Sequence, residues 1–359
     1  MTKTIMIMAG GTGGHVYPAM AVADYLKSLG WKVVWLCTEG GMENRLIAHK
    51  NYDKATITMQ GVRGKGLLGW MRLPITLLRA FSQSIKALKQ HQPNVVLGMG
   101  GFAAFPGGLM AKVLGHPVVI HEQNSVAGLT NKVLAKIATR VLVAFPSVLG
   151  KKAFLIGNPL RDEITSLAPP EERFAKHEGD LRLLVVGGSL GAQALNDVIP
   201  QALAKMPQQM RPIVIHQAGV KQIDALKNNY ANVGVKADTR AYIDDMANMY
   251  DWADFVICRA GALTVAEVSA VGLGSLMVPF PFAVDDHQTT NAALLESGGA
   301  AFVVQQNALS VDKLVSILGE LNREKCLDMA VKARALGRPK ATMEVAEICI
   351  QVAEQGMDT

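Results

Sequence analysis

The stretch TIMIMAGGTGGH at residues 4–15 decides the fold class, because a short apolar run passes directly into a glycine-rich turn. An apolar run of this length, without polar alternation, is typical of a strand buried on both faces of a parallel sheet. A glycine-rich turn between a strand and a helix lets backbone N–H groups approach a phosphate, and the helix start adds favourable partial charge. The stretch therefore predicts a βα unit with an anion-binding turn.

The same pattern recurs along the chain. Short apolar runs alternate with longer helical patterns, which predicts βαβ units and parallel sheets. A second glycine-rich turn at 187–191 opens the second half as the first turn opens the first. The sequence thus predicts two similar α/β halves. We expect strands at 4–9, 33–37, 55–59, 94–98, 117–121, 140–144, 153–156, 181–186, 212–216, 232–236, 254–258, 275–279 and 300–304.

The break between the halves lies near the breaker GNP at 157–159, before the polar stretch 165–180. We place the first domain at 1–162 and the second at 163–340. A final helix at about 341–355 follows another breaker, and we expect the segment 341–359 to pack back on the first domain.

Neither of the two turns that open the halves carries the GxGxxG spacing of dinucleotide-binding proteins; in the first, Val16 occupies the third glycine position. Glu39 could still mimic the acid that binds a ribose, so NAD binding is disfavoured rather than excluded. A third glycine-rich turn lies at 98–102. Three turns in matching positions favour a cleft for phosphates and polar ligands over turns that only allow tight packing.

Charge is distributed unevenly. Residues 1–160 hold 18 Lys and Arg against 5 Asp and Glu, whereas the remainder holds 18 against 25. The segment 54–121 has eight basic and no acidic residues. Such a one-sided distribution indicates a polyanionic partner, either nucleic acid or anionic lipid. No uncharged apolar run reaches 18 residues, so we expect no transmembrane helix.

The sequence gives no sign of a metal or cofactor. The four cysteines have neither CxxC nor histidine-paired spacing, which disfavours a zinc site or disulfides and suits a reducing compartment. An Asp-x-Asp motif, whose paired carboxylates often hold Mn²⁺ or Mg²⁺, is also missing from the sequence. We therefore predict no metal and no cofactor.

The second half carries a sharper signal in RAGALTVAE at 259–267. If a helix begins near Ala262, its first N–H groups at 262–264 have no intrahelical partner and can bind a diphosphate. Glu267 lies on the same helix face as Leu263 and Thr264, where it could accept both hydroxyls of a ribose. The alternative is a solvated helix glutamate. The polar cluster DDHQTTN at 285–291 offers partners for sugar hydroxyls.

A basic and apolar surface is predicted in the first half. Arg72, Arg79 and Lys86 recur every seven residues on one side of a helical segment after Pro74, with apolar side chains opposite. A flexible basic loop at 61–71 precedes it. Together they predict reversible docking on an anionic leaflet rather than an ordinary solvated helix. The predicted membrane patch comprises Arg63, Lys65, Leu67, Leu68, Trp70, Arg72, Ile75, Arg79 and Lys86.

Five motifs in order, GGTGGH at 10–15, HEQN at 121–124, GNP at 157–159, GALTVAE at 261–267 and DHQTTN at 286–291, resemble the MurG family of peptidoglycan glycosyltransferases. The resemblance spans the whole chain. It implies the GT-B fold, an α/β arrangement of two Rossmann-like parallel-sheet domains facing across a cleft. It also implies transfer of N-acetylglucosamine from UDP-GlcNAc to the C4 hydroxyl of undecaprenyl-linked MurNAc-pentapeptide (lipid I). The product would be lipid II, made with inversion at the cytoplasmic face of the bacterial inner membrane, with no nucleic acid involved.

The resemblance also implies a set of donor contacts. Glu267 would hold the ribose, Gln288 the sugar and Ser189 the diphosphate, while Ile243 would meet uracil through its backbone. The first domain would bind the acceptor and the membrane, and the second would bind UDP-GlcNAc. The implied substrate-binding residues are Thr12, Gly13, Gly14, Asn124, Arg161, Ser189, Ile243, Ala262, Leu263, Thr264, Val265, Ala266, Glu267 and Gln288.

Inverting transfer needs a base for the acceptor hydroxyl, and His15 and Glu122 are the catalytic candidates because both follow strands of the first domain. His15 could instead bond a phosphate or the backbone, and Glu122 could orient His121 or a substrate amide. Two rival functions stay open at this point. One is a UDP-GlcNAc 2-epimerase, which needs no acceptor; the other is a non-catalytic basic adaptor.

Overall fold

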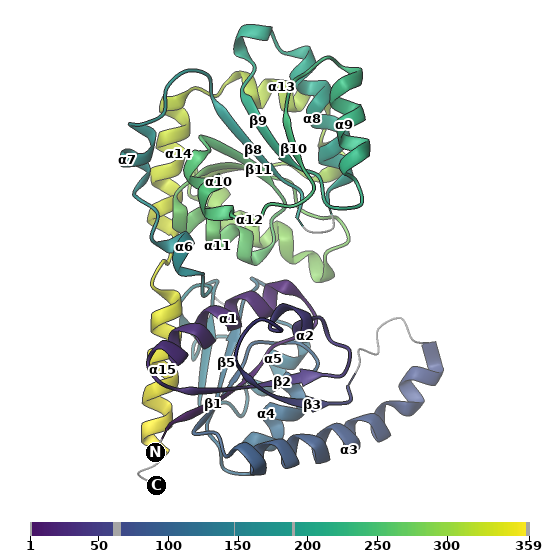
Figure 1. The fold of residues 1–359 in the computed structure, drawn as a ribbon, viewed down its shortest axis with the longest axis vertical. Coiled ribbons are helices and arrows are strands. Elements are labelled where there is room, and N and C mark those ends of the chain that lie inside the picture. The colour runs from purple at the N-terminus through teal and green to yellow at the C-terminus, as the bar shows by residue number, and fades with distance from the viewer. Residues whose placement is uncertain (1, 60–65, 147, 189–190, 357–359) are drawn as a thin grey trace. The chain divides into compact units, whose positions relative to one another are not determined.

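The computed structural model describes residues 2–59, 66–146, 148–188 and 191–356, apart from the side chains of 66–72 and Val284. The chain divides into two compact units (Figure 1). Unit 1 comprises Met1–Arg161 and Pro339–Thr359, and unit 2 comprises Asp162–Arg338. Each unit contains one parallel sheet with helices packed against it.

The sheet of unit 1 has the order β3-β2-β1-β4-β5-β6-β7, and its described strand pairs are all parallel. The order reverses between β1 and β4, which makes that edge a topological switch point, where open α/β sheets bind ligands. The strands are β1 (Thr4–Met8), β2 (Lys32–Thr38), β3 (Asp53–Ile57), β4 (Val95–Gly98), β5 (Val118–Glu122), β6 (Arg140–Val143) and β7 (Phe154–Leu155).

Successive side chains of β1 supply the two cores of unit 1, because a strand alternates its side chains between the faces of the sheet. Ile5 and Ile7 pack in the core that holds α1 and α15, whereas Met6 and Met8 pack in the core of α3, α4 and α5. The helices are α1 (Gly13–Ser28), α2 (Met42–Leu46), α3 (Gly66–His91), α4 (Ala104–Val113), α5 (Leu129–Leu134) and α15 (Ala341–Gln355).

The last helix, α15, returns to unit 1 and packs on α1 (Figure 1). Val345, Cys349 and Val352 are buried in the core that they share with β1 and α1. At the start of the helix, Thr342 Oγ1 accepts a hydrogen bond from Leu160 N at 2.9 Å. Residues from both ends of the chain thus build a single core.

Unit 2 repeats the topology with six strands in the order β10-β9-β8-β11-β12-β13, and its switch point lies between β8 and β11. The strands are β8 (Arg182–Val186), β9 (Ile213–Gln217), β10 (Asp238–Arg240), β11 (Phe255–Cys258), β12 (Gly274–Met277) and β13 (Ala301–Val303). The helices are α6 (Asp162–Thr165), α7 (Pro170–Phe174), α8 (Gln193–Lys205), α9 (Ile223–Asn232), α10 (Met246–Trp252), α11 (Ala262–Val271), α12 (His287–Ser297), α13 (Val311–Gly319) and α14 (Arg323–Leu336), with 3-10 turns at Gln208–Met210, Val284–Asp286 and Gln306–Ala308.

One predicted strand is wrong. Residues 232–236 end α9 and begin a loop, and the edge strand β10 lies at Asp238–Arg240 instead. Gly234 has a φ of 65°, and Val235 N donates to Tyr230 O at 3.2 Å, so the chain reverses at the helix end. Val235 packs against the core from that position. The apolar alternation that suggested a strand therefore serves the end of a helix.

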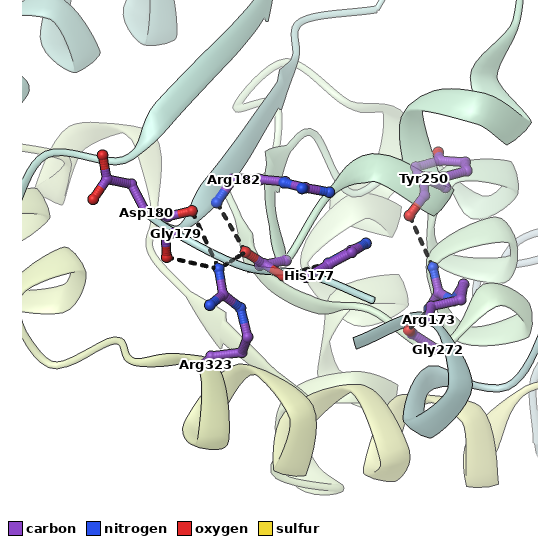
Figure 2. Close-up of polar contacts among 9 residues, drawn as sticks. Arg173, His177, Gly179, Asp180, Arg182, Tyr250, Gly272 and Arg323 are labelled. Atoms are coloured by element: carbon purple, nitrogen blue, oxygen red, sulfur yellow. Dashed lines mark hydrogen bonds and ion pairs between the residues drawn. The ribbon is translucent and has the colours of Figure 1, made fainter. Parts of the chain in front are cut away.

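A buried polar cluster holds the amino ends of β8 and β11 (Figure 2). Asp254, which is fully buried, accepts hydrogen bonds from His177 Nδ1 at 2.7 Å, Arg182 N at 3.0 Å and Arg323 at 3.2 Å. Buried charges require this kind of pairing, because leaving water costs several kcal/mol per ion (order of magnitude). The cluster ties β8, β11 and α14 together on the side of the sheet away from the strands' carboxyl ends.

Arg173 anchors the neighbouring helices in the same way. The residue is 2% exposed, and its guanidinium donates to the carbonyl oxygens of Tyr250 at 2.8 Å and Gly272 at 2.5 Å (Figure 2). Burial lowers the pKa of this group to about 10. Because this value is still well above neutral pH, the guanidinium remains charged. Through the Tyr250 carbonyl, Arg173 fixes the end of α10.

The four cysteines are free and buried. Burial raises the pKa of each thiol from its usual value of 9.0 to about 12. Thiolates, the reactive form of cysteine, are therefore scarce at neutral pH. The four side chains are Cys37, Cys258, Cys326 and Cys349.

Candidate functional site

At the switch point of unit 1, the turn after β1 meets the turn after β4. Gly100 and Gly101 have φ of 95° and 88°, a region that favours glycine. A Cβ on Gly101 would lie 2.4 Å from Gly10 O, so the two turns are in backbone contact. This close approach brings the start of α1 against the end of β4.

His15 lies in the first turn of α1, directly after the glycines. Its Nδ1 is 2.9 Å from Gln123 Oε1, which belongs to the segment after β5. Its ring rests on Gly100, where an added Cβ would lie 2.9 Å from Nδ1 and Cε1. The half-buried imidazole is thus held by the hydrogen bond to Gln123 at one edge and by the backbone of Gly100 against its ring.

Glu122 ends β5 and is 1% exposed. Oε1 accepts from Asn124 N at 3.0 Å and Asn124 Nδ2 at 3.4 Å, while Oε2 accepts from Gly128 N at 3.0 Å and Asn131 Nδ2 at 2.9 Å. Four donors occupy the carboxylate's acceptor positions. The side chain therefore shapes the loop 124–131, which includes the predicted donor contact Asn124.

Two neighbours of Glu122 continue the network toward His15. His121 is fully buried, and its Nε2 lies 2.8 Å from Gly157 O. Gln123 Nε2 lies 3.2 Å from His121 Nδ1 and 3.1 Å from His121 O. Burial lowers the pKa of His121 to about 4 and keeps its imidazole neutral at physiological pH. Sequence reasoning did not assign a role to Gln123, although it stands inside the HEQN motif.

In unit 2 the corresponding edge presents the start of α11. The helix begins at Ala262, where the sequence predicted it, after the extended cap residue Gly261. The first intrahelical hydrogen bond runs from Val265 N to Gly261 O at 2.9 Å. The N–H groups of residues 262–264 therefore have no acceptor within the helix. The cap residue Gly261 has no side chain that could cap these amides.

Glu267 lies one turn into α11 and is only 8% exposed, so it is not a solvated surface glutamate. Tyr250, from α10, donates its hydroxyl proton to Glu267 Oε2 at 3.0 Å. Sequence reasoning did not identify Tyr250, because nothing in its local pattern shows that α10 packs beside α11. The tyrosine is itself held through its carbonyl by Arg173 (Figure 2).

The remaining predicted contacts are dispersed over both units. In unit 2, Gln288 Oε1 accepts from Phe280 N at 2.9 Å, and Ile243 is buried. In unit 1, Thr12 caps α1 without a side-chain hydrogen bond, and Arg161 is partly buried at the last position before unit 2. Ser189 lies outside the described residues.

Most of the predicted membrane patch falls on α3, and the structure corrects one expectation. The helix begins at Gly66 and includes Pro74, so most of the predicted flexible loop 61–71 is helical. Two apolar side chains of this helix are exposed, Leu78 at 69% and Ile75 at 72%. Arg79 and Lys86 are exposed.

The remaining members of the patch lie wholly or partly outside the part of the chain that the structure describes. Arg63 and Lys65 lie outside the described residues, and so do the side chains of Leu67, Leu68, Trp70 and Arg72. None of the helices in the described part of the chain is long and apolar enough to span a membrane. Within the same residues, no group of three or more His, Cys, Asp or Glu side chains could hold a metal ion.

Comparison with known proteins defines the class. Residues 5–143 match the glycosyltransferase family 28 N-terminal domain, and residues 182–348 match the glycosyltransferase family 28 C-terminal domain. These two matches cover most of unit 1 and most of unit 2, and together they define a two-domain glycosyltransferase.

Full-length relatives narrow this class. A protein of Cupriavidus metallidurans is 56% identical over 98% of this chain and 98% of its own length, and one of Nitrosospira multiformis is 52% identical over 98% and 99%. Both carry the name UDP-N-acetylglucosamine--N-acetylmuramyl-(pentapeptide) pyrophosphoryl-undecaprenol N-acetylglucosamine transferase. The chain belongs to this family of N-acetylglucosamine transferases, the MurG family. The predicted family is confirmed.

Solved structures agree. The crystal structure of Acinetobacter baumannii MurG is 41% identical, covers 97% of this chain and 99% of its own, and has a TM-score of 0.86. The predicted GT-B class with two Rossmann-like domains is confirmed. A UDP-N-acetylglucosamine 2-epimerase has a TM-score of 0.66 at 14% identity, which shows a shared fold alone.

Proposed function

We propose that this chain transfers N-acetylglucosamine from UDP-GlcNAc to the C4 hydroxyl of lipid I, with inversion, to give lipid II for peptidoglycan synthesis. The observation that carries the proposal is the likeness, over nearly the full chain, to relatives that bear this activity in their names. The basic adaptor hypothesis explains the charge of the first half but not the donor motifs of the second.

Unit 2 supplies the donor site in this proposal. The amides at 262–264 bind the diphosphate, and Glu267 binds the ribose hydroxyls. A helix start stabilises an anion by roughly 0.3–1 kcal/mol at a surface and up to about 2 kcal/mol when partly buried. The same donors stabilise the negative charge that the departing UDP develops. Ile243, Gln288, Ser189 and the other contacts implied by the family stay predictions.

Unit 1 supplies the base. Both oxygens of Glu122 are buried and engaged by four N–H donors, which favours a positioning role for this carboxylate. His15 is half-buried at the switch point, with one ring nitrogen engaged by Gln123. We therefore assign deprotonation of the acceptor hydroxyl to His15 and the shaping of loop 124–131 to Glu122.

The acceptor is a lipid, and α3 is the proposed docking element at the cytoplasmic face of the inner membrane. Exposed Ile75 and Leu78 stand in the same helix as exposed Arg79 and Lys86. Apolar side chains next to basic ones suit the boundary of an anionic leaflet, where each basic residue contributes about 1 kcal/mol.

The decisive experiment incubates the purified chain with radiolabelled UDP-GlcNAc and a soluble lipid I analogue. Release of UDP together with a labelled disaccharide on the analogue supports the transfer. A parallel incubation without acceptor tests the epimerase alternative, since only an epimerase accumulates an isomer of the donor. Failure to form the disaccharide, with the donor either unchanged or epimerised, would refute the proposal.

A further inference from the structure

A continuous line of hydrogen bonds runs from a main-chain carbonyl to His15. It passes from Gly157 O to His121, from His121 to Gln123, and from Gln123 to His15, with separations of 2.8, 3.2 and 2.9 Å. His121 and Gln123 are 0% and 1% exposed. The positions of the hydrogens can be deduced from such a network only where some partner can only donate or only accept. Two main-chain carbonyl oxygens, which can only accept, meet that condition here.

The first fixed point is Gly157 O, which can only accept. His121 Nε2 must therefore carry a proton and donate to it. The buried imidazole is neutral, so its second nitrogen, Nδ1, has a lone pair. His121 Nδ1 consequently accepts from whatever group faces it.

The second fixed point is His121 O, which lies 3.1 Å from Gln123 Nε2. Because a carbonyl accepts only, the NH2 end of the Gln123 amide must point there. The other N–H of this group faces His121 Nδ1, 3.2 Å away, in agreement with the lone pair derived from the first carbonyl, and the weak acceptor Met99 Sδ lies farther off at 3.9 Å. The amide oxygen Oε1 is then the end that faces His15.

An amide oxygen accepts, so His15 Nδ1 must donate to Gln123 Oε1. We propose that Gln123 and His121 are positioning residues that hold neutral His15 as its Nδ1–H tautomer, which places the lone pair on Nε2. The inference rests on the proposed role of His15 as the base. Free imidazole side chains in water favour the opposite tautomer, so the network selects the form that the chemistry requires.

The proposed step balances as follows. The O–H bond of the acceptor C4 hydroxyl breaks as a new N–H bond forms at His15 Nε2. The oxygen forms its bond to the anomeric carbon, and the bond from that carbon to the UDP oxygen breaks, so the electron pair leaves with UDP. The resulting imidazolium keeps its Nδ1–H bond to Gln123. Gly100 supports the ring from below, because any Cβ there would overlap it.

The tautomer can be observed directly by long-range 1H–15N NMR of the 15N-histidine-labelled full chain, with His15→Ala to assign the signals. We expect His15 to show a protonated Nδ1 and an unprotonated Nε2 in the wild-type protein. In Gln123→Met and, separately, in His121→Phe, we expect the Nε2–H tautomer to gain population. A wild-type His15 protonated at Nε2, or a tautomer that neither variant changes, would overturn the inference.

Kinetics then test whether the tautomer matters. We expect Gln123→Met to lower kcat roughly 10- to 100-fold with KM for both substrates within about threefold. The matched control, Gln83→Met, removes a glutamine that bonds Thr58 N at 2.7 Å in the same unit, and should leave kcat unchanged with a soluble acceptor. An unchanged kcat in Gln123→Met, while His15→Ala is inactive, rejects the relay but keeps His15 as base. An active His15→Ala rejects the base itself.

Discussion

In unit 1 the switch point between β1 and β4 is lined by side-chain hydrogen bonds that converge on His15, whereas in unit 2 the place between β8 and β11 presents the backbone start of α11. Both sheets follow the same order and both open with a glycine turn. Backbone amides are fixed donors, well suited to a diphosphate whose charge is always present. Proton transfer instead needs a group that changes state, and in the proposed function the His15 side chain supplies it. The comparison teaches how, under that proposal, one topology divides binding and chemistry between its two copies.

The largest effect is expected from removing the proposed catalytic base of unit 1. Replacing His15 with alanine should lower kcat by roughly 10²- to 10⁴-fold, because general base catalysis typically contributes that much. Donor affinity, measured by UDP titration, should stay within about twofold, since the proposed nucleotide site lies in unit 2. His49→Ala, an exposed histidine of the same unit, is the control. If His15→Ala and Glu122→Gln both keep kcat within about tenfold of wild type, the base lies elsewhere.

The next effect concerns the proposed membrane-docking helix α3 of unit 1. Changing Arg72, Arg79 and Lys86 to glutamate should weaken binding to phosphatidylglycerol vesicles by roughly 10²-fold, since each basic residue contributes about 1 kcal/mol. Turnover of a soluble acceptor should be unchanged. A matched triple reversal in unit 2, at the exposed Lys221, Lys227 and Lys236, should leave vesicle binding intact. Equal losses in both triple variants would show that net charge, not α3, drives binding.

A smaller effect is expected at the proposed donor site of unit 2. Glu267→Gln should raise KM for UDP-GlcNAc about 10- to 100-fold, because hydrogen bonds to a charged group contribute roughly 1.5–3 kcal/mol. Glu296→Gln, an exposed glutamate of α12, serves as control. Calorimetry with UDP alone separates ribose contacts from sugar contacts. Unaltered UDP affinity in Glu267→Gln would move the ribose away from α11.

The smallest effect tests the support behind Glu267. Tyr250→Phe removes one hydroxyl donor and should raise KM for UDP-GlcNAc about fivefold, since a neutral hydrogen bond contributes ~1 kcal/mol. Tyr230→Phe removes a buried hydroxyl that lies 3.0 Å from His216 in the same unit. It should reduce stability without changing KM. Identical KM values for the two variants would contradict an orienting role for Tyr250.

Much of this fold could be read from local sequence, because buried parallel strands and glycine turns leave strong local patterns. The helix start at Ala262 and the final helix at 341–355 were predicted where the structure has them. The strand expected at 232–236 was wrong because an apolar pair that closes a helix looks like a strand when read alone.

What the sequence could not show are contacts between distant residues. Gln123 meets His15 across 108 positions, and Tyr250 meets Glu267 from a different helix. Each depends on how elements pack, which no local pattern records. The same holds for Glu122, whose four donors come from its own loop but only once that loop is folded. Motifs supplied the candidate site residues, and packing decides which side chains support them.

The burial of all four thiols makes the native chain a ready background for site-specific chemistry. Reagents such as maleimides attack thiolates, and with each thiol's pKa near 12 the natural cysteines should react slowly while the protein is folded. A single cysteine introduced on exposed α3 or α9 would then be the main labelled position. A fluorophore at that position would report on the proposed membrane docking in an otherwise unmodified enzyme.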